Sequence, residues 1–201
     1  MTDTANFTTA IILSGGAGRR LNGVDKGLQG YLASTLIEHV ITRVSPQVNS
    51  IVICANRNIN RYKAMGVAIC QDQKRGYQGP MSGISSALSE HLIESAATHA
   101  LVSSCDVPRL PLTLKERLQH GLNSRPEAGV AVAHDGKRRQ NLHCLIKREA
   151  WQSLIDYFEN GGRAMHRWYQ EYATIDVDFS DCPECFVNIN TKPQLQQAID
   201  N

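Results

Sequence analysis

Apolar residues along the chain fall into short continuous runs that alternate with stretches of helical spacing. A continuous run of aliphatic and β-branched residues predicts a strand buried on both faces, as in a parallel sheet. We expect such strands at residues 9–13, 51–55, 67–70, 100–105, 129–133, 142–146 and 174–177. Their alternation with helices predicts β-α-β units and a mostly parallel sheet that becomes mixed towards its end.

Helices are predicted where apolar residues recur three and four positions apart. Leu36, Val40 and Val44 follow this spacing before Pro46 ends the pattern. We expect helices at residues 35–44, 62–65, 84–92, 111–122, 151–158 and 165–169, and a last helix from about residue 193. The pattern predicts a Rossmann-like, three-layer α/β/α fold without internal repeats or linkers.

The composition fits this architecture and excludes several classes of protein. With 201 residues and 42% hydrophobic content, the chain can bury one sizeable core, which predicts a single domain over residues 1–201. The net charge of +2 is too small, and the basic residues are too scattered, for a nucleic-acid-binding surface. Residues 1–8 form no secretory leader and no apolar run is long enough to span a membrane, so we expect a cytoplasmic protein without membrane contact.

Most of the six cysteines lie inside apolar runs, as small buried thiols do in a reducing compartment. These are Cys54, Cys70, Cys105 and Cys144. The other two form a Cys-Pro-Glu-Cys motif at residues 182–185, whose spacing suits half of a zinc site or a redox pair. No second pair of matching spacing follows, so we interpret this motif as structural.

The first strand runs directly into a glycine-rich loop at residues 14–26. Glycines accept positive φ, so the backbone can turn sharply and direct successive N–H groups towards one anion. Arg19, Arg20 and Lys26 add positive charge to the same loop. The pattern predicts binding of a polyphosphate, and the alternative is a surface glycine turn with solvated charges.

Two other glycine motifs can be tested against this loop. A P-loop requires Lys and then Ser or Thr after its second glycine, whereas Gly23 is followed by Val24 and Asp25. A dinucleotide-binding fingerprint that starts at Gly16 needs a third glycine where the chain has Leu21. The P-loop is therefore excluded, and the dinucleotide fingerprint matches only in part.

Polar residues also follow other predicted strands at the point where each strand ends. Asn56, Asp72 and Asp106 follow separate strands, and Gly79 and Pro80 lie in a loop that opens a helix. In open parallel α/β sheets, ligands bind outside the carboxyl ends of the strands. We therefore expect one crevice at this edge to collect these residues together with the glycine loop.

The loop resembles the signature, from Leu-x-Gly-Gly to a lysine, of nucleotidyltransferases that activate small molecules with a nucleoside triphosphate. It is most similar to the molybdenum cofactor guanylyltransferases, the MobA family, because residues 23–28 follow the double arginine at that family's spacing. Further family motifs follow in order at residues 56–57, 71–72, 79–83, 105–108 and 187–191. The resemblance implies a nucleotide-diphospho-sugar-transferase-like fold and transfer of GMP from GTP to molybdenum-bound molybdopterin, with release of pyrophosphate.

The resemblance also implies roles for individual residues. It implies that Arg20, Lys26 and Asp106 are catalytic and that Asp106 holds Mg²⁺ as the cofactor. The N-terminal half would bind the nucleotide, mainly through Leu13, Ser14, Gly15, Gly16, Lys26, Cys54, Asn56, Asp72 and Asp106. The acceptor would lie against residues that extend into the C-terminal half, namely Gly79, Pro80, Gly83, Asn188 and Asn190.

The chemistry of nucleotidyl transfer supports these roles. An acceptor phosphate oxygen attacks the α-phosphorus in line, so the protein mainly positions phosphates and neutralises their charge. Arg20 and Lys26 can hold the triphosphate, and Asp106 offers the oxygen ligands that suit Mg²⁺. The Asp72 carboxylate can accept hydrogen bonds from the N1–H and N2–H₂ edge of guanine, which would favour GTP over ATP.

Each of these residues also has a purely structural interpretation. Asp72 could cap a turn or a helix, Asp106 could form an Asx turn, and Asn188 and Asn190 could cap the last helix. We interpret His143 as a packed strand residue in preference to a catalytic base.

Besides residues 138–141, where relatives usually carry a proline near Asn141 on the acceptor side of the site, the chain departs from the family pattern at three places. Ser14 stands where alanine is common, and Cys54 stands where relatives often place an asparagine near the guanine. Residues 31–34 lack the usual Gly-Lys-Pro turn. These departures concern the base and the neighbouring turn more than the phosphates.

Two alternative functions remain open from the sequence. One is a related nucleotidyltransferase that uses CTP or a sugar phosphate, although the short loop and the small chain argue against the sugar enzymes. The other is a non-catalytic GTP-binding adaptor for molybdoenzyme assembly, which would need Lys26 but not Asp106. Because the chain has both, we favour an enzyme whose partners are GTP and molybdenum-bound molybdopterin, with molybdoenzyme-assembly proteins as further candidate partners.

Overall fold

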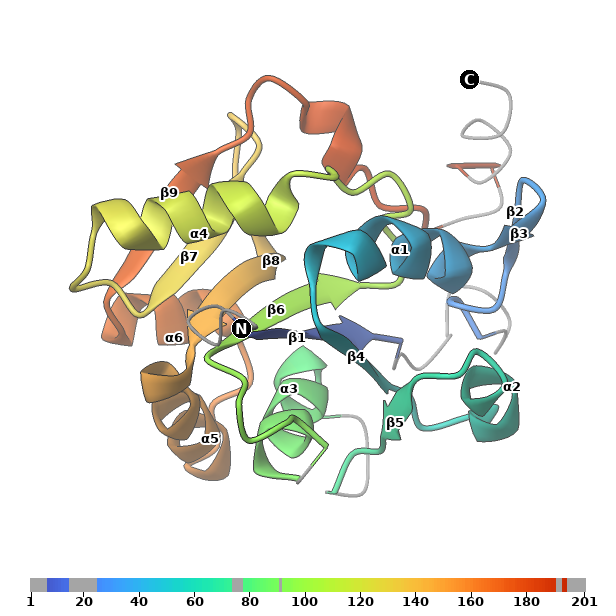
Figure 1. The fold of residues 1–201 in the computed structure, drawn as a ribbon, viewed down its shortest axis with the longest axis horizontal. Coiled ribbons are helices and arrows are strands. Elements are labelled where there is room, and N and C mark those ends of the chain that lie inside the picture. Colours follow the sequence, from blue (N-terminus) through green and yellow to red (C-terminus); the bar gives the residue numbers. More distant parts are fainter. Residues whose placement is uncertain (1–6, 15–24, 74–77, 91, 191–192, 195–201) are drawn as a thin grey trace, which may run out of the picture.

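The computed structural model describes residues 7–14, 25–73, 78–90, 92–190 and 193–194, and these residues form three layers. A central sheet lies between two layers of helices (Figure 1). One face carries α1 (Leu36–Val44) and α4 (Leu114–Ser124), and the other carries α3 (Pro80–Ser89), α5 (Trp151–Glu159) and α6 (Met165–Glu171). The predicted fold class, a single-domain α/β/α arrangement with a mostly parallel sheet, is confirmed.

The described part of the chain forms a main sheet of seven strands. Their order across the sheet is β5 (Ala68–Cys70), β4 (Ser50–Cys54), β1 (Thr8–Leu13), β6 (His99–Ser104), β8 (Arg139–Lys147), β7 (Val130–His134) and β9 (Thr174–Asp178). Only β8 runs against its neighbours within these residues, so the predicted change to a mixed sheet is also confirmed. The parallel strands β5, β4, β1 and β6 all end at one edge, where α/β folds bind their ligands.

Strands β1 and β6 lie at the centre of the sheet, and every residue in both is buried. Their sequences lack a polar face because helices cover both sides of the sheet. In the β1 register, Leu13 lies opposite Cys54 of β4 and Ser104 of β6. The ends of these three strands are therefore level with one another.

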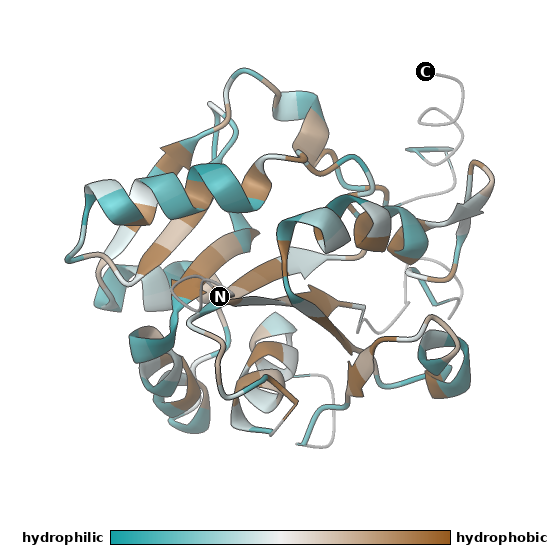
Figure 2. Ribbon diagram, in the orientation of Figure 1, coloured by the Kyte–Doolittle hydropathy of each residue, from teal (hydrophilic) through white to brown (hydrophobic). Residues whose placement is uncertain are grey.

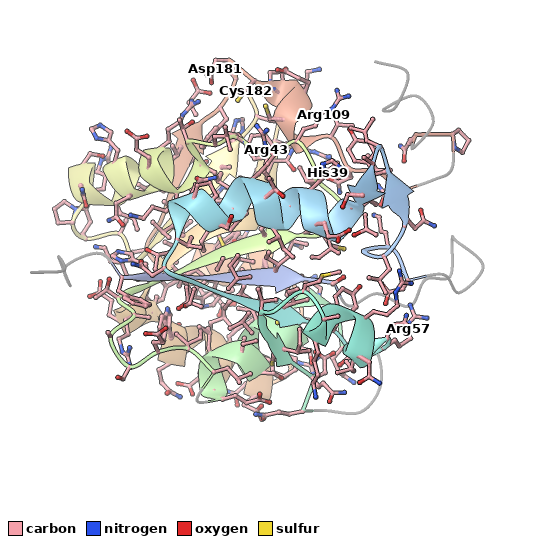
Figure 3. All side chains as sticks on the ribbon, turned by 45° about the vertical axis from the view of Figure 1, so that its right-hand side comes forward. His39, Arg43, Arg57, Arg109, Asp181 and Cys182 are labelled. Atoms are coloured by element: carbon pink, nitrogen blue, oxygen red, sulfur yellow. The ribbon has the colours of Figure 1, made fainter. Side chains whose placement is uncertain are left out.

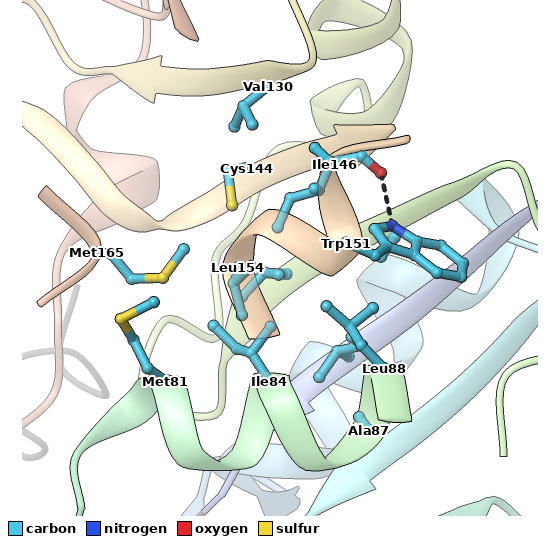
Figure 4. Packing of buried hydrophobic residues seen from close by; sticks show 14 of the residues in the cluster. Met81, Ile84, Ala87, Leu88, Val130, Cys144, Ile146, Trp151, Leu154 and Met165 are labelled. Carbon is cyan, nitrogen blue, oxygen red and sulfur yellow. Dashed lines mark hydrogen bonds between the residues drawn. The ribbon is translucent and has the colours of Figure 1, made fainter. Parts of the chain in front are cut away.

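Each face of the sheet has its own apolar core. Ile84 of α3 and Trp151 of α5 belong to the core on one face, where the Trp151 indole N–H also donates to the Ile146 carbonyl at 3.3 Å (Figure 4). Val40 of α1 and Leu118 of α4 belong to the core on the other face. Figure 2 shows the result, with hydrophobic strands in the middle and hydrophilic residues on the outer sides of α1 and α4. No helix in the part of the chain that the structure describes is both long and apolar enough to cross a membrane.

Several predicted boundaries are wrong. The helix expected at residues 62–65 is α2 (Ile59–Lys63), because Asn58 begins it in a left-handed conformation and Gly66 follows it with positive φ. Helix α4 begins at Leu114 instead of residue 111, and β8 extends back to Arg139, into the expected charged turn.

Five short elements were not predicted. They are the hairpin of β2 (Gly30–Tyr31) and β3 (Ser34–Thr35), and the 3₁₀ turns η3 (Ser45–Gln47), η4 (Arg148–Ala150) and η5 (Pro183–Phe186). Elements of two to four residues are too short to show a hydrophobic period, so pattern analysis does not detect them. Residues 31–34, where the sequence lacks a Gly-Lys-Pro turn, form the tip of this hairpin.

Candidate functional site

Three polar side chains meet beyond the carboxyl ends of β1 and β6. The Lys26 ammonium donates hydrogen bonds to Asp106 Oδ2 and to Asn190 Oδ1, each at 2.5 Å. The other Asp106 oxygen accepts a hydrogen bond from the Ser104 hydroxyl at 2.6 Å. The Lys26 and Asp106 side chains remain 23% and 15% exposed, so a ligand can reach this cluster.

The backbone explains why these residues meet. Asp106 is the second residue after β6, at the predicted strand end. The Ile189 N–H donates to the Asp106 carbonyl at 2.9 Å, which holds the segment with Asn188 and Asn190 against this strand end. The structure thus brings Lys26, Asp106 and Asn190 together beyond the strand ends, while their chemical roles stay predictions.

Asn56 and Asp72 form a second group at the same edge of the sheet. Strands β4 and β5 are parallel neighbours in which Cys54 lies opposite Cys70. Asn56 and Asp72 each follow two residues later, and the Asn56 side-chain oxygen accepts the Asp72 backbone N–H at 2.8 Å. This bond fixes the backbone of Asp72 and uses neither of its carboxylate oxygens.

Helix α3 packs closely against this second group through Gly83. A Cβ at Gly83 would lie 3.1 Å from both Cys54 Cβ and Leu13 Cδ2, and 3.6 Å from Asp72 Oδ1. The Cys54 thiol donates to the Gly83 carbonyl at 3.2 Å, so it faces α3. Contact with the Cys70 thiol, together with burial, raises the pKa of Cys54 well above its usual value. Leu13, Cys54 and Gly83 therefore form a close-packed support beside the Asp72 carboxylate.

Gly79 and Pro80 shape the loop that leads into α3. Gly79 has a φ of 77°, which favours glycine, and Pro80 occupies the first position of the helix. Arg163 Nε donates to Gln78 Oε1 at 2.9 Å, and a Cβ at Gly79 would lie 3.6 Å from the Arg163 carbonyl oxygen. The expected acceptor loop is thus held by Arg163, a contact that the sequence pattern did not indicate.

A buried hydrogen-bonded network beside Lys26 was missed by sequence analysis. The Tyr62 hydroxyl lies 2.6 Å from Ser14 Oγ and donates to Asp25 Oδ1 at 2.6 Å. Asn58 Nδ2 donates to Asp25 Oδ2 at 3.0 Å. The only signal in the sequence is that Asp25 precedes Lys26, because Asn58 and Tyr62 are 33 and 37 positions away from Asp25.

Some predicted residues lie outside these groups. The expected phosphate contacts of Gly15, Gly16 and Arg20 fall outside the described residues. His143 is buried on β8 with its ring centroid 5.5 Å from that of Phe186, and burial lowers its pKa to about 4. The interpretation of His143 as a packed strand residue is therefore confirmed.

The Cys-Pro-Glu-Cys motif lies at η5, the short turn that precedes Asn188 and Asn190 along the chain. Cys182 and the neighbouring Asp181 lie on the segment before η5, whereas Arg57 lies beside α2 (Figure 3). Cys182 and Cys185 are half-buried free thiols, and the other cysteines are fully buried. Over the described ranges, no three or more His, Cys, Asp or Glu side chains are grouped so that they could hold a metal ion.

Comparison with known proteins adds a separate set of observations. Residues 10–175 match the family model of the MobA-like NTP transferase domain. The chain is 42% identical over 195 residues to the molybdenum cofactor guanylyltransferase of Shewanella pealeana. This alignment covers 96% of this chain and 95% of that protein. It is 39% identical over 188 residues to the protein of the same name from Pasteurella multocida, with coverage of 94% and 97%.

A solved structure from Archaeoglobus fulgidus has the same fold. The molybdopterin-guanine dinucleotide biosynthesis protein A of that organism aligns with a TM-score of 0.74, over 96% of this chain and 97% of that chain. Because the sequences are only 20% identical, this likeness supports the architecture and says nothing about individual site residues.

Proposed function

Because the chain belongs to the MobA-like NTP transferase family, we propose that it transfers GMP from GTP to molybdenum-bound molybdopterin and releases pyrophosphate. The observation that carries the proposal is the meeting of the Lys26 ammonium, the Asp106 carboxylate and the Asn190 amide at the strand ends. A cation beside a carboxylate suits a triphosphate that arrives with a metal ion. The names of the relatives from Shewanella pealeana and Pasteurella multocida support guanine as the base and the molybdenum cofactor as the acceptor.

The reaction needs positioning and charge neutralisation but no protein nucleophile. A phosphate oxygen of the acceptor forms a bond to the α-phosphorus of GTP, and the bond from that phosphorus to pyrophosphate breaks. Negative charge builds up on the phosphate oxygens during this exchange. Lys26 would give up one of its present acceptors for a phosphate oxygen and neutralise part of that charge, and we propose that Arg20 assists it.

Asp106 fits the role of a Mg²⁺ ligand. One of its oxygens accepts from the Ser104 hydroxyl, the other accepts from Lys26, and the side chain is partly exposed. Mg²⁺ commonly binds to one or two carboxylates together with substrate phosphates, so a single aspartate is sufficient. When bound, the ion would neutralise phosphate charge and help pyrophosphate to leave.

We assign guanine recognition to Asp72. Its backbone is fixed by the Asn56 side chain, and its carboxylate lies beside Gly83 near the carboxyl ends of β4 and β5. A carboxylate accepts hydrogen bonds from the guanine N1–H and N2–H₂ groups, whereas adenine presents an acceptor at N1. The acceptor molecule would then lie between the loop of Gly79 and Pro80 and the segment that contains Asn188 and Asn190.

The proposal is tested by measuring pyrophosphate release from each nucleoside triphosphate in the presence of Mg²⁺ and molybdenum-bound molybdopterin. We expect release with GTP that depends on both the acceptor and Mg²⁺. If CTP were the only nucleotide that supported pyrophosphate release, the protein would be a related cytidylyltransferase. Tight binding of GTP without any release would instead identify a GTP-binding adaptor.

A further inference from the structure

Asp25, the residue before Lys26, is a buried carboxylate held by helix α2. It is 8% exposed and accepts hydrogen bonds from the Tyr62 hydroxyl at 2.6 Å and from Asn58 Nδ2 at 3.0 Å. Asn58 is the N-cap residue of α2, and Tyr62 lies four positions later. Residues four apart lie on the same face of a helix, so α2 presents both donors to one carboxylate.

The hydrogen bonds around Tyr62 have a defined direction. Tyr62 has a single hydroxyl proton and donates it to Asp25. The Ser14 hydroxyl, 2.6 Å from the Tyr62 oxygen, must then donate to Tyr62. Burial, followed by the bond to Asp25, raises the pKa of Tyr62 far above its usual value, which keeps this proton in place. A chain of hydrogen bonds therefore joins Ser14, at the end of β1, to the residue before Lys26.

Gly27 completes the packing on the other side of Lys26. A Cβ at Gly27 would lie 2.2 Å from Ser14 Oγ and 2.8 Å from the Tyr62 oxygen, so a larger residue does not fit without displacing the network. The Gly27 carbonyl accepts the Ile37 N–H at 3.0 Å, which ties this segment to α1. Of the two sequence neighbours of Lys26, Asp25 is thus hydrogen-bonded to the Tyr62 hydroxyl and Gly27 packs against the Ser14 and Tyr62 hydroxyls.

We propose that Tyr62 and Asp25 are positioning residues that hold the backbone of Lys26 in the orientation needed for nucleotidyl transfer. The proposal rests on the function proposed above, because that function places Lys26 on the triphosphate. Both residues are buried, so they act through the backbone of residues 25–27 and not by touching the substrate. The side chain of lysine is long and flexible, so it neutralises charge on a ligand most effectively when the backbone that carries it is fixed in advance.

Tyr62→Phe removes the hydroxyl and keeps the ring, and Tyr169→Phe is its matched control. The buried Tyr169 hydroxyl donates to the Asn141 carbonyl at 2.8 Å, but it belongs to α6 and to the core on the other face of the sheet. We expect Tyr62→Phe to lower kcat about tenfold or more, since it breaks two buried hydrogen bonds. Tyr169→Phe also removes a buried hydrogen bond, so it should lower the stability of the protein to a comparable extent, but it should leave kcat within about twofold of the parent value.

Hydrogen exchange gives a readout that does not depend on catalysis. Amides in the peptide of residues 25–35 should exchange faster in Tyr62→Phe than in the parent, and their exchange should not change in Tyr169→Phe. The double variant Asp25→Ala/Tyr62→Phe should lose little more activity than Asp25→Ala alone, because both changes break one network. If Tyr62→Phe does not fold, Asn58→Gly serves instead, since it removes one donor and keeps the φ of 52° accessible.

A folded Tyr62→Phe protein with unchanged kcat and unchanged exchange at residues 25–35 would overturn the proposal. Equal losses in Tyr62→Phe and Tyr169→Phe would also overturn it, because they would reveal a general loss of stability. If the parent protein releases no pyrophosphate, the proposed function fails, and the exchange data alone then decide whether the network holds the loop.

Discussion

The Lys26–Asp106 ion pair contributes little to the stability of the fold. Both side chains are largely buried, so the cost of removing the two charges from water offsets much of their attraction. Yet the ammonium is shared between Asp106 and Asn190, which come from distant parts of the chain. We therefore attribute the arrangement to ligand binding, where an ammonium and a carboxylate at one strand edge can act on phosphates and their counterion.

At the same scale, Asp72→Asn tests how the base is selected. An amide offers a donor as well as an acceptor, so it should tolerate the adenine edge better than the carboxylate does. We expect the preference for GTP over ATP, measured as the ratio of kcat/KM values, to narrow by about tenfold or more, because a hydrogen bond to a charged group contributes about 1.5–3 kcal/mol. An equal ratio in variant and parent would exclude Asp72 as the residue that recognises guanine.

At the scale of secondary structure elements, strands were easier to predict than the short segments that complete the site. β1 and β6 are continuous apolar runs because both their faces are buried, and that requirement is visible in the sequence. Because ligands bind at the carboxyl ends of parallel strands, the sequence also predicts that Asp72 and Asp106 lie at one edge of the sheet.

The remaining parts of the site have no such local signal. Helix α2 has five residues, and its role depends on Asn58 and Tyr62 contacting Asp25 across more than 30 positions. The contact of Arg163 with Gln78 likewise joins distant segments through a single side chain. Contacts of this kind arise only after the chain has folded, so hydrophobic periodicity and strand-end rules cannot predict them.

Gly83→Ala tests how tightly α3 packs against the end of the sheet. Alanine usually stabilises a helix by about 1 kcal/mol relative to glycine. Here its Cβ would lie 3.1 Å from Cys54 Cβ and from Leu13 Cδ2, so overpacking, which typically costs about 1–3 kcal/mol, should dominate. We expect a lower Tm and weaker GTP binding.

Gly30→Ala is the matched control for this change, because a Cβ at Gly30 would meet no atom within 4 Å. It should leave both Tm and GTP affinity close to those of the parent. If Gly83→Ala were as stable as Gly30→Ala and bound GTP equally well, α3 would not be packed as closely as described.

At the scale of the whole molecule, two buried histidines link folding to pH. Burial lowers the pKa of His99 in β6 and of His143 in β8 to about 4, compared with an ordinary value of 6.5. Between these values the unfolded chain binds protons that the folded chain excludes. The free energy of unfolding should therefore fall as the pH is lowered from about 6.5 towards 4, and these groups should have no effect above pH 7.

Denaturant unfolding at pH 7 and pH 5 checks this expectation. The variant His99→Gln/His143→Gln should lose less stability between the two pH values than the parent loses, whatever its stability at pH 7. Carboxylates titrate in both proteins, so the difference between the two pH dependences isolates the histidines. Equal pH dependence in the two proteins would show that neither histidine is kept neutral by burial.

The most direct test of the catalytic assignment is Asp106→Asn, with Asp176→Asn as a control that removes a carboxylate from an ion pair on β9. The asparagine is nearly isosteric, so fold and most of the GTP affinity should remain. Turnover, measured as pyrophosphate release at saturating GTP and acceptor, should fall roughly a hundredfold or more, which corresponds to about 2.7 kcal/mol in the barrier. Near-normal turnover with unaltered Mg²⁺ dependence and the same Tm would contradict the account, because Asp106 would then only cap the turn that follows β6.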